Sequence, residues 1–170
     1  MKPTRPTRRA LTAIGIATVA ALATALPAEA QAPPAPLTFT ELDKGSTFRY
    51  IDHPPRARLR NGLPVRTSAG DQLVFMNPLA DAAGTSIGRL HAACTVTSTG
   101  RINRLEAECV GRVGLSSGSN IFVAAPISFS AEGPVVGAVI GGTGAYAGAR
   151  GTFTSTSAGR DQRTTITFLP

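Results

Sequence analysis

The feature that most constrains the fold is residues 135–151, where a run of β-branched residues leads into a dense cluster of glycines. A second β-rich run, 152–156, follows directly. Each glycine inside a helix costs about 1 kcal/mol relative to alanine, whereas glycines permit positive φ angles and close backbone approach. The pattern therefore predicts a strand, a tight reversal and a second strand. Within the reversal, Tyr146 is the only large apolar side chain and Arg150 the only charged one.

The glycines also imitate part of a dinucleotide-binding fingerprint. Residues 142–147 read Gly-x-Gly-x-x-Ala after a predicted strand, and Asp161 lies near the offset of a ribose-binding acid. However, the glycines and arginine of 148–151 would break the helix that such a site needs. Too little chain follows Asp161 for a second βαβ unit. A nucleotide site is therefore disfavoured.

The chain from Leu37 onward is rich in Thr, Val, Ile and Phe runs broken by turn-forming residues. Alternation in Leu37-x-Phe39 and Ile166-x-Phe168 indicates one buried face per strand. The sequence predicts an all-β domain, an antiparallel barrel or sandwich. The predicted strands are 37–43, 47–52, 72–76, 87–98, 102–115, 121–129, 135–140, 152–157 and 163–169.

One connection, residues 52–70, is rich in proline, arginine and glycine and is long for a hairpin. Such a segment is either a solvated connection or a lid or interface element.

The N-terminal segment has the pattern of a secretory signal peptide. Four basic residues precede the uncharged run 10–26, and Ala28-Glu29-Ala30 supplies a small-x-small cleavage site. The run is too short and too rich in Ala and Thr for a membrane span. We predict a signal peptide at 1–30, a flexible Pro/Ala tether at 31–36 and one domain at 37–170. The protein is then secreted by a Sec-type route, with twin-arginine export through Arg8-Arg9 as an alternative.

Charge and motif content exclude several functions. Beyond residue 30 the chain has 13 basic and nine acidic residues, a net charge of +4. The arginines are scattered and not interleaved with aromatic residues, so we predict no nucleic-acid surface. His53 and His91 lack metal-ligand spacing, and no Gly-x-Ser-x-Gly elbow occurs. We therefore predict no metal and no cofactor.

Cys94 and Cys109 are the only cysteines. Their midpoint falls beside the turn signal Thr99-Gly100-Arg101, so a hairpin folded there would bring the two sulfurs together. An exported protein favours oxidation. The sequence predicts a structural disulfide.

Two acids, Glu41 and Asp43, occupy alternate positions of a predicted strand and would share one face. On a cavity face, burial would raise the pKa of one acid while the other stayed ionised. The alternative is an outward, solvated pair at the start of an edge strand.

Two segments resemble the dirigent and allene oxide cyclase superfamily. Residues 141–151, GGTGAYAGARG, are similar to its GGTG-x-(aromatic)-x-x-ARG segment. Residues 69–79 with Gly84 and Gly88 are similar to its GD-strand-(Asn/Asp)-x-Leu segment and the spaced glycines that follow. The resemblance implies an eight-stranded antiparallel β-barrel with a central cavity, and a homo-oligomer such as a dimer or trimer.

The resemblance also implies a site. Allene oxide cyclases carry Glu-Leu-Asn at the strand matching residues 41–43 and a second Asn matching Asn77, and these polarise the substrate epoxide through water. Glu41 and Asn77 match, whereas Asp43 departs, as does Thr47 where the enzymes have proline after the serine. The candidate catalytic residues are Glu41, Asp43 and Asn77, and the candidate cavity residues are Ser46, Phe75, Tyr146 and Arg150. For Arg150, a structural clamp on the glycine loop is the alternative.

The predicted function is an exported barrel that binds a small, mostly apolar, phenolic or lipid-like molecule. It would guide cyclisation, isomerisation or stereoselective coupling by holding one conformer and excluding water, without a cofactor. The alternatives are a ligand-binding barrel without turnover and a structural or interaction module.

Overall fold

The computed structural model describes residues 33–53, 59–60 and 63–170, and the residues from Gln31 to Pro170 form one compact unit. The predicted signal peptide and the first two residues of the predicted tether lie outside the described residues. The elements are β1 (Leu37–Glu41), β2 (Thr47–Ile51), β3 (Leu59–Arg60), β4 (Leu63–Pro64), β5 (Arg66–Thr67), β6 (Gln72–Ala80), β7 (Ser86–Val96), β8 (Gly100–Arg101), η1 (Ile102–Arg104), β9 (Glu106–Leu115), β10 (Asn120–Ser128), β11 (Val135–Thr143), η2 (Gly144–Tyr146), β12 (Gly151–Ala158) and β13 (Asp161–Phe168).

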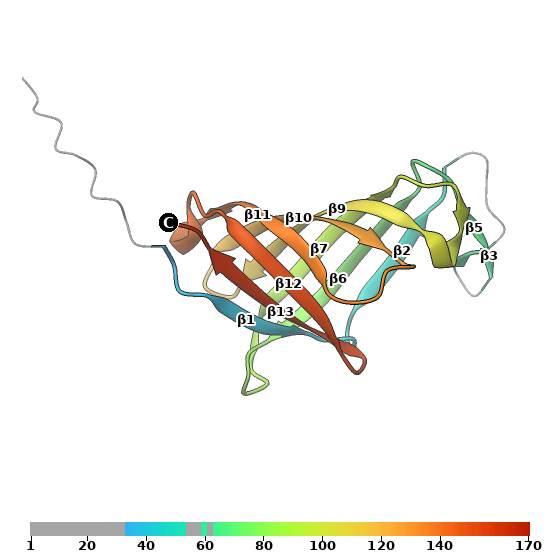
Figure 1. The fold of residues 1–170 in the computed structure, drawn as a ribbon. Coiled ribbons are helices and arrows are strands. Elements are labelled where there is room, and N and C mark those ends of the chain that lie inside the picture. Colours follow the sequence, from blue (N-terminus) through green and yellow to red (C-terminus); the bar gives the residue numbers. More distant parts are fainter. Residues whose placement is uncertain (1–32, 54–58, 61–62) are drawn as a thin grey trace, which may run out of the picture. The chain divides into compact units, whose positions relative to one another are not determined.

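Nine strands form one antiparallel sheet in the order β1-β13-β12-β11-β10-β9-β7-β6-β2, and β1 also pairs with β6. That second pairing closes eight strands into a barrel, visible in Figure 1. The all-β, eight-stranded antiparallel barrel is thereby confirmed. β2 pairs with the early part of β6 and β1 with its end, so both lie along one edge of β6.

The barrel wall alternates between interior and exterior along each strand. On β7, Leu90, Ala92, Cys94 and Val96 are buried, while the intervening residues are exposed. The interior side chains form two apolar clusters. The main cluster contains Phe39, Leu79, Leu90, Val113, Ile121, Val123, Val139, Ala149, Ile166 and Phe168, and the second contains Leu73, Cys94, Val96, Leu105 and Ala107.

The predicted strand 102–115 is wrong at its start, because residues 102–104 form the 3-10 turn η1. The backbone N–H of Leu105 donates to the carbonyl of Ile102 at 3.1 Å. Leu105 is fully buried in the second cluster, so the turn delivers this side chain to the core before β9 begins. The end of the long connection 52–70 pairs here, because β5 is hydrogen-bonded to β8. Residues 54–58 and 61–62 of this connection lie outside the described residues.

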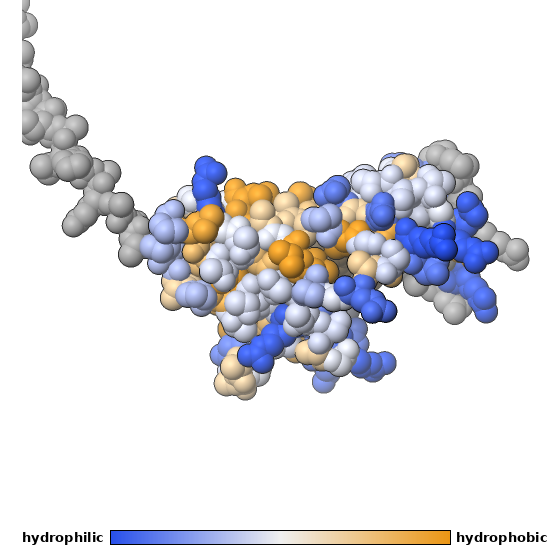
Figure 2. All heavy atoms as spheres, in the orientation of Figure 1, coloured by the Kyte–Doolittle hydropathy of each residue, from blue (hydrophilic) through white to orange (hydrophobic). Residues whose placement is uncertain are grey.

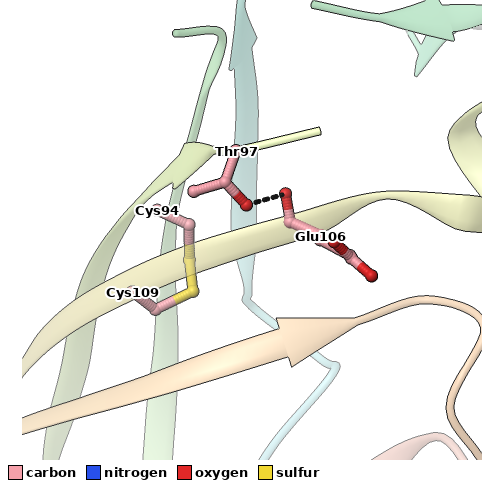
Figure 3. Close-up of a disulfide and its surroundings, with 4 residues drawn as sticks. All are labelled: Cys94, Thr97, Glu106 and Cys109. Atoms are coloured by element: carbon pink, nitrogen blue, oxygen red, sulfur yellow. Dashed lines mark hydrogen bonds between the residues drawn. A yellow bond between two sulfur atoms is a disulfide. The ribbon is translucent and has the colours of Figure 1, made fainter. Parts of the chain in front are cut away.

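The disulfide between Cys94 and Cys109 is present and joins directly opposed residues of β7 and β9. Figure 3 shows it beside Thr97, whose hydroxyl donates to the backbone carbonyl of Glu106 at 3.2 Å. Cys94 is buried within the second apolar cluster. A bonded pair is compatible with an extracellular location.

The glycine-rich reversal is a strand, a single 3-10 turn and a strand. β11 continues to Thr143, farther than predicted, and η2 covers Gly144 to Tyr146. Gly144 has φ +64°, whereas at Gly142 the constraint is space: a Cβ there would lie 2.2 Å from the carbonyl oxygen of Tyr146. The two glycines are thus required for different reasons.

Among the described residues, no helix has the length and apolar character to cross a membrane.

Candidate functional site

A buried polar network lies on the inner face of the barrel where β1 closes the sheet. Glu41 is 8% exposed and is opposite Leu79 of β6 and Gln162 of β13. Asn77 lies two residues before Leu79, and Thr164 lies two residues after Gln162, so both share the face of Glu41. Ser155 is the register partner of Thr164 on β12. We call Glu41, Asn77, Thr164 and Ser155 the Glu41 network.

The contacts of this network satisfy both carboxylate oxygens. Asn77 Nδ2 donates to Glu41 Oε2 at 3.0 Å, and the Thr164 hydroxyl lies 2.7 Å from Glu41 Oε1. The Ser155 and Thr164 hydroxyls are 2.9 Å apart. A buried carboxyl group without such partners would be strongly unfavourable, so these bonds explain how Glu41 is accommodated beside the main cluster.

The hydroxyl pair can serve Glu41 in both of its protonation states. An ionised carboxylate only accepts, so Thr164 then donates its single proton to Glu41 and Ser155 donates to Thr164. With Glu41 protonated, the order reverses: Glu41 donates to Thr164, and Thr164 donates to Ser155. The network can therefore provide hydrogen-bond partners for either form of the carboxyl group.

The structure separates Asp43 and Ser46 from this network. β1 ends at Glu41, and both residues are exposed in the turn toward β2, where the Ser46 N–H donates to the Asp43 carbonyl at 3.0 Å. The expectation that Glu41 and Asp43 share a face is wrong, because the strand does not extend to Asp43. The Asp43 N–H donates to Asp161 Oδ1 at 2.9 Å.

The remaining candidates lie in two places. Phe75 is on the inner face of β6 and packs against both apolar clusters. Tyr146 is half-buried in the reversal and stacks on Phe168 with ring centroids 5.2 Å apart. Arg150 is exposed, so its side chain does not contribute to the interior, and its backbone carbonyl accepts from the Leu169 N–H.

A second buried carboxyl group, Asp71, was not singled out from the sequence. It is fully buried and accepts hydrogen bonds from the Tyr50 hydroxyl, from the His53 N–H at 2.9 Å and from the Ser68 N–H at 2.6 Å. Burial alone would raise the pKa of Asp71, but the Tyr50 hydroxyl and the two backbone N–H groups outweigh it and lower the pKa. Burial and the neighbouring Asp71 raise the pKa of Tyr50. This cluster joins β2 to the residues on both sides of the long connection.

Sequence reasoning also missed Thr164 and Ser155. The alternation Ile166-x-Phe168, extended back by two residues, would have placed Thr164 on the buried face. Nothing in the sequence pairs Thr164 with Ser155, because that contact depends on the register of β12 and β13.

Four hollows, of about 940, 440, 370 and 330 Å³, are lined by described residues. Neither Glu41 nor Asn77 lines any of these four. The hollow of about 940 Å³ lies on the outer wall, over β2, β6, β7, β9, β10 and β11.

Comparison with known proteins gives a consistent account of the fold. No protein-family model matches the chain, and no curated protein matches it. A solved structure of a pyocyanin demethylase is similar, with a TM-score of 0.59 and 22% identity over 79% of this chain and 100% of the other. The pterocarpan synthase dirigent protein GePTS1 has a TM-score of 0.59 and 19% identity over 78% of this chain and 82% of its own. The pterocarpan synthase dirigent protein PsPTS1 has a TM-score of 0.54 and 17% identity over 80% of this chain and 94% of its own.

These similarities extend over most of each chain, and the strand order closes the same kind of barrel. At such low identity they establish the architecture, and the resemblance seen in the sequence is confirmed at that level. The chain has the fold of the dirigent and allene oxide cyclase-like barrels.

Proposed function

We propose that the protein binds a small, mostly apolar molecule inside the barrel and that the Glu41 network is the polar contact for this molecule. The observation that carries the proposal is a carboxyl group 8% exposed, held by side chains of two other strands among apolar residues and linked through Thr164 to a third strand. Apolar surroundings with a few convergent polar groups are typical of small-molecule sites. The similar structures are named as a demethylase and two synthases, which supports chemistry on small molecules in this fold.

Within this proposal, Glu41 acts as a general acid or base in a cofactor-free cyclisation, isomerisation or coupling. Its Oε1 exchanges a proton with the bound molecule while the hydroxyls of Thr164 and Ser155 reverse their donation. Asn77 holds Oε2 and so fixes the direction of the carboxyl group. The rest of the catalysis is confinement of one conformer away from water.

The substitution Glu41→Gln tests this function, because it keeps the shape and removes the titrating group. Small molecules that co-purify with the exported protein would be identified by mass spectrometry and then supplied to both proteins. The variant should bind the compound but convert it at a rate that is lower by ~10²-fold or more. Asp43→Asn, in the exposed turn, is the matched control and should behave as the parent. Equal turnover, affinity and pH profile for Glu41→Gln and the parent would refute the role of Glu41.

A second candidate function is ligand binding without turnover. It is favoured by the two apolar clusters in the interior and by the absence of Glu41 and Asn77 from the lining of the four hollows described above. The same experiment separates the two functions: a compound recovered unchanged after incubation with the parent protein indicates a binding protein.

Export is part of the proposal, with cleavage after Ala30. It is supported by the basic start, the uncharged run and the small-x-small site. Intact-mass measurement of the secreted protein should give a chain beginning at Gln31, and a mass that includes residues 10–26 would contradict it.

A further inference from the structure

The outer wall of the barrel carries a large exposed apolar surface. Val110 of β9 is 59% exposed and Ile140 of β11 is 58% exposed, and Val74 and Phe122 are also exposed. Apolar side chains are visible in orange along the upper edge of the molecule in Figure 2, over β10 and β11. Large exposed apolar surfaces on soluble proteins commonly mark binding sites.

The strand register explains why a groove forms there. Val74, Ala93 and Val110 are successive register partners across β6, β7 and β9. Ala93 is the small member between two larger side chains, so the surface is lower over β7. Together with the neighbouring row through Met76 and Phe122, this forms the hollow of about 940 Å³, which we call the outer groove.

One end of the outer groove is basic. His91 and Arg112 are register partners on β7 and β9, and both line the groove. They also line the adjoining hollow of about 370 Å³, together with Arg89, which lies two residues before His91 on the same face. Within the part of the chain that the structure describes, none of these three side chains forms a salt bridge. Arg89 and Arg112 therefore present positive charge without a protein counter-ion, and the His91 ring lies beside them.

Gly114 opens a small polar recess beside this basic end. A Cβ at Gly114 would lie 3.4 Å from Asn120 Oδ1, 3.7 Å from the backbone oxygen of Arg89 and 3.9 Å from Arg112 Nε. The Arg112 guanidinium thus lies next to a polar recess that a larger residue would fill. The recess is continuous with the apolar groove, because His91 and Arg112 line both.

We propose that the outer groove binds a free, single-chain anionic amphiphile such as a long-chain carboxylate. The carboxylate contacts Arg112, Arg89 and His91 at the polar recess, and the apolar chain lies along Val110, Met76 and Phe122. The site is separate from the Glu41 network and independent of the function proposed for it.

Charge and size select this occupant. On the outer face of β9, Glu108 lies two residues before Val110, and Arg112 lies two residues after it. Glu108 lines a separate hollow, whereas Arg49, the register partner of Val74, lines the outer groove as well. The two arginines of the groove, Arg49 and Arg112, therefore both attract an anionic head. The volume is within the range of small-molecule sites, and arginine can bind a carboxylate through two parallel hydrogen bonds.

The experiment uses laurate below its micelle concentration as the probe, with dodecanol and dodecyltrimethylammonium as matched neutral and cationic compounds. Titration calorimetry should show that the full chain binds laurate, dodecanol more weakly and the cation not at all. Arg112→Gln should weaken laurate binding by about tenfold and reduce its salt dependence. Gly114→Leu, which fills the recess, should weaken it as well. The control Arg163→Gln, an exposed arginine of β13 outside the groove, should leave binding unchanged.

Several results would overturn the proposal. One is equal affinity of the parent and Arg112→Gln for laurate, with both variants shown to be folded by circular dichroism. Another is self-association of the parent in sedimentation analysis that Val110→Asp abolishes, because the face would then be occupied by a second copy of the chain. A third is co-sedimentation with anionic phospholipid vesicles in the absence of laurate binding, which would assign the groove to a membrane surface.

Discussion

Thr164 is the residue on which the buried position of Glu41 depends most directly. Its hydroxyl contacts Glu41 Oε1 and Ser155 Oγ, and the side chain is 3% exposed. Thr164→Val keeps the shape but leaves the Glu41 oxygen and the Ser155 hydroxyl without this partner. The free energy of unfolding should fall by about 1–3 kcal/mol.

Urea denaturation of the parent and the variant measures this loss. Thr167→Val is the matched control, because Thr167 is on the same strand but exposed. An equal loss for the two variants would show that the hydroxyl of Thr164 does not stabilise Glu41, and would weaken its assignment to the network.

Asp71 makes a distinct prediction about pH. Its pKa is lowered in the folded protein, so it stabilises the fold fully above the unfolded carboxyl pKa of about 4, and this contribution is lost as the pH falls through the folded value. Asp71→Asn should be less stable than the parent at neutral pH, and the difference in melting temperature should narrow as the solution is acidified. A difference that stays constant down to pH 2 would contradict the hydrogen-bonded, ionised Asp71 described above.

At the scale of one element, the glycine-rich reversal makes a graded prediction. Gly142→Ala places a Cβ against the backbone oxygen of Tyr146, and backbone cannot move aside cheaply. Gly148→Ala meets no atom within 4 Å and adds only the strain of a φ of +73°, about 1–2 kcal/mol. Thermal melting should therefore rank Gly142→Ala as much the more damaging change. Tyr146→Phe removes one hydroxyl and keeps the ring on Phe168, so it should be nearly neutral.

A lower melting temperature for Gly148→Ala than for Gly142→Ala would show that the loop repacks around position 142.

Gly144→Ala adds a further comparison, since it combines a φ of +64° with a Cβ 2.6 Å from the Ser119 hydroxyl. Its cost should lie between those of the other two alanine variants, because a hydroxyl can rotate where a backbone oxygen cannot.

The elements that could be predicted from the sequence are those whose burial alternates without interruption. All nine strands of the main sheet are predicted, but β6 runs to Ala80 and not to the predicted end at Met76. Proline has no N–H to donate, and Pro78 is tolerated because it lies between the residues of β6 that pair with β2 and those that pair with β1. Its carbonyl accepts from the Leu42 N–H at 2.9 Å. Local turn propensity was overridden by a contact between strands far apart in the sequence.

The candidate site shows the same limit. Glu41 and Asn77 could be named because the resemblance supplied them, and the structure places them in contact. Asp43 could not be excluded by a period-two pattern, since nothing in residues 41–43 shows where β1 ends. Thr164, Ser155 and the Asp71 cluster depend on register and on the folding of the long connection, which no local pattern encodes.

At the scale of the whole molecule, the barrel interior contains two apolar clusters, one beside the Glu41 network and one that includes the disulfide. The Glu41 network lies beside the main cluster, on the strands that close the sheet, β1, β6, β12 and β13. The disulfide lies in the second cluster, between β7 and β9. Changes to the disulfide should therefore affect stability without altering the polar network.

The double substitution of Cys94 and Cys109 by Ala tests this separation. The cysteines are 15 residues apart, and opening a loop of that length should lower the free energy of unfolding by about 3 kcal/mol. The barrel should still form, because β7 and β9 are paired from Gly88 to Val96 with Cys94 as one position among these.

Urea denaturation of the parent with and without a reductant, and of the double variant, measures the loss. The reduced parent and the variant should unfold at similar, lower urea concentrations, while Thr164→Val should cost the same in both backgrounds, because sites without shared contacts are additive. A strongly different cost of Thr164→Val in the two backgrounds would show instead that the two clusters fold as one coupled core.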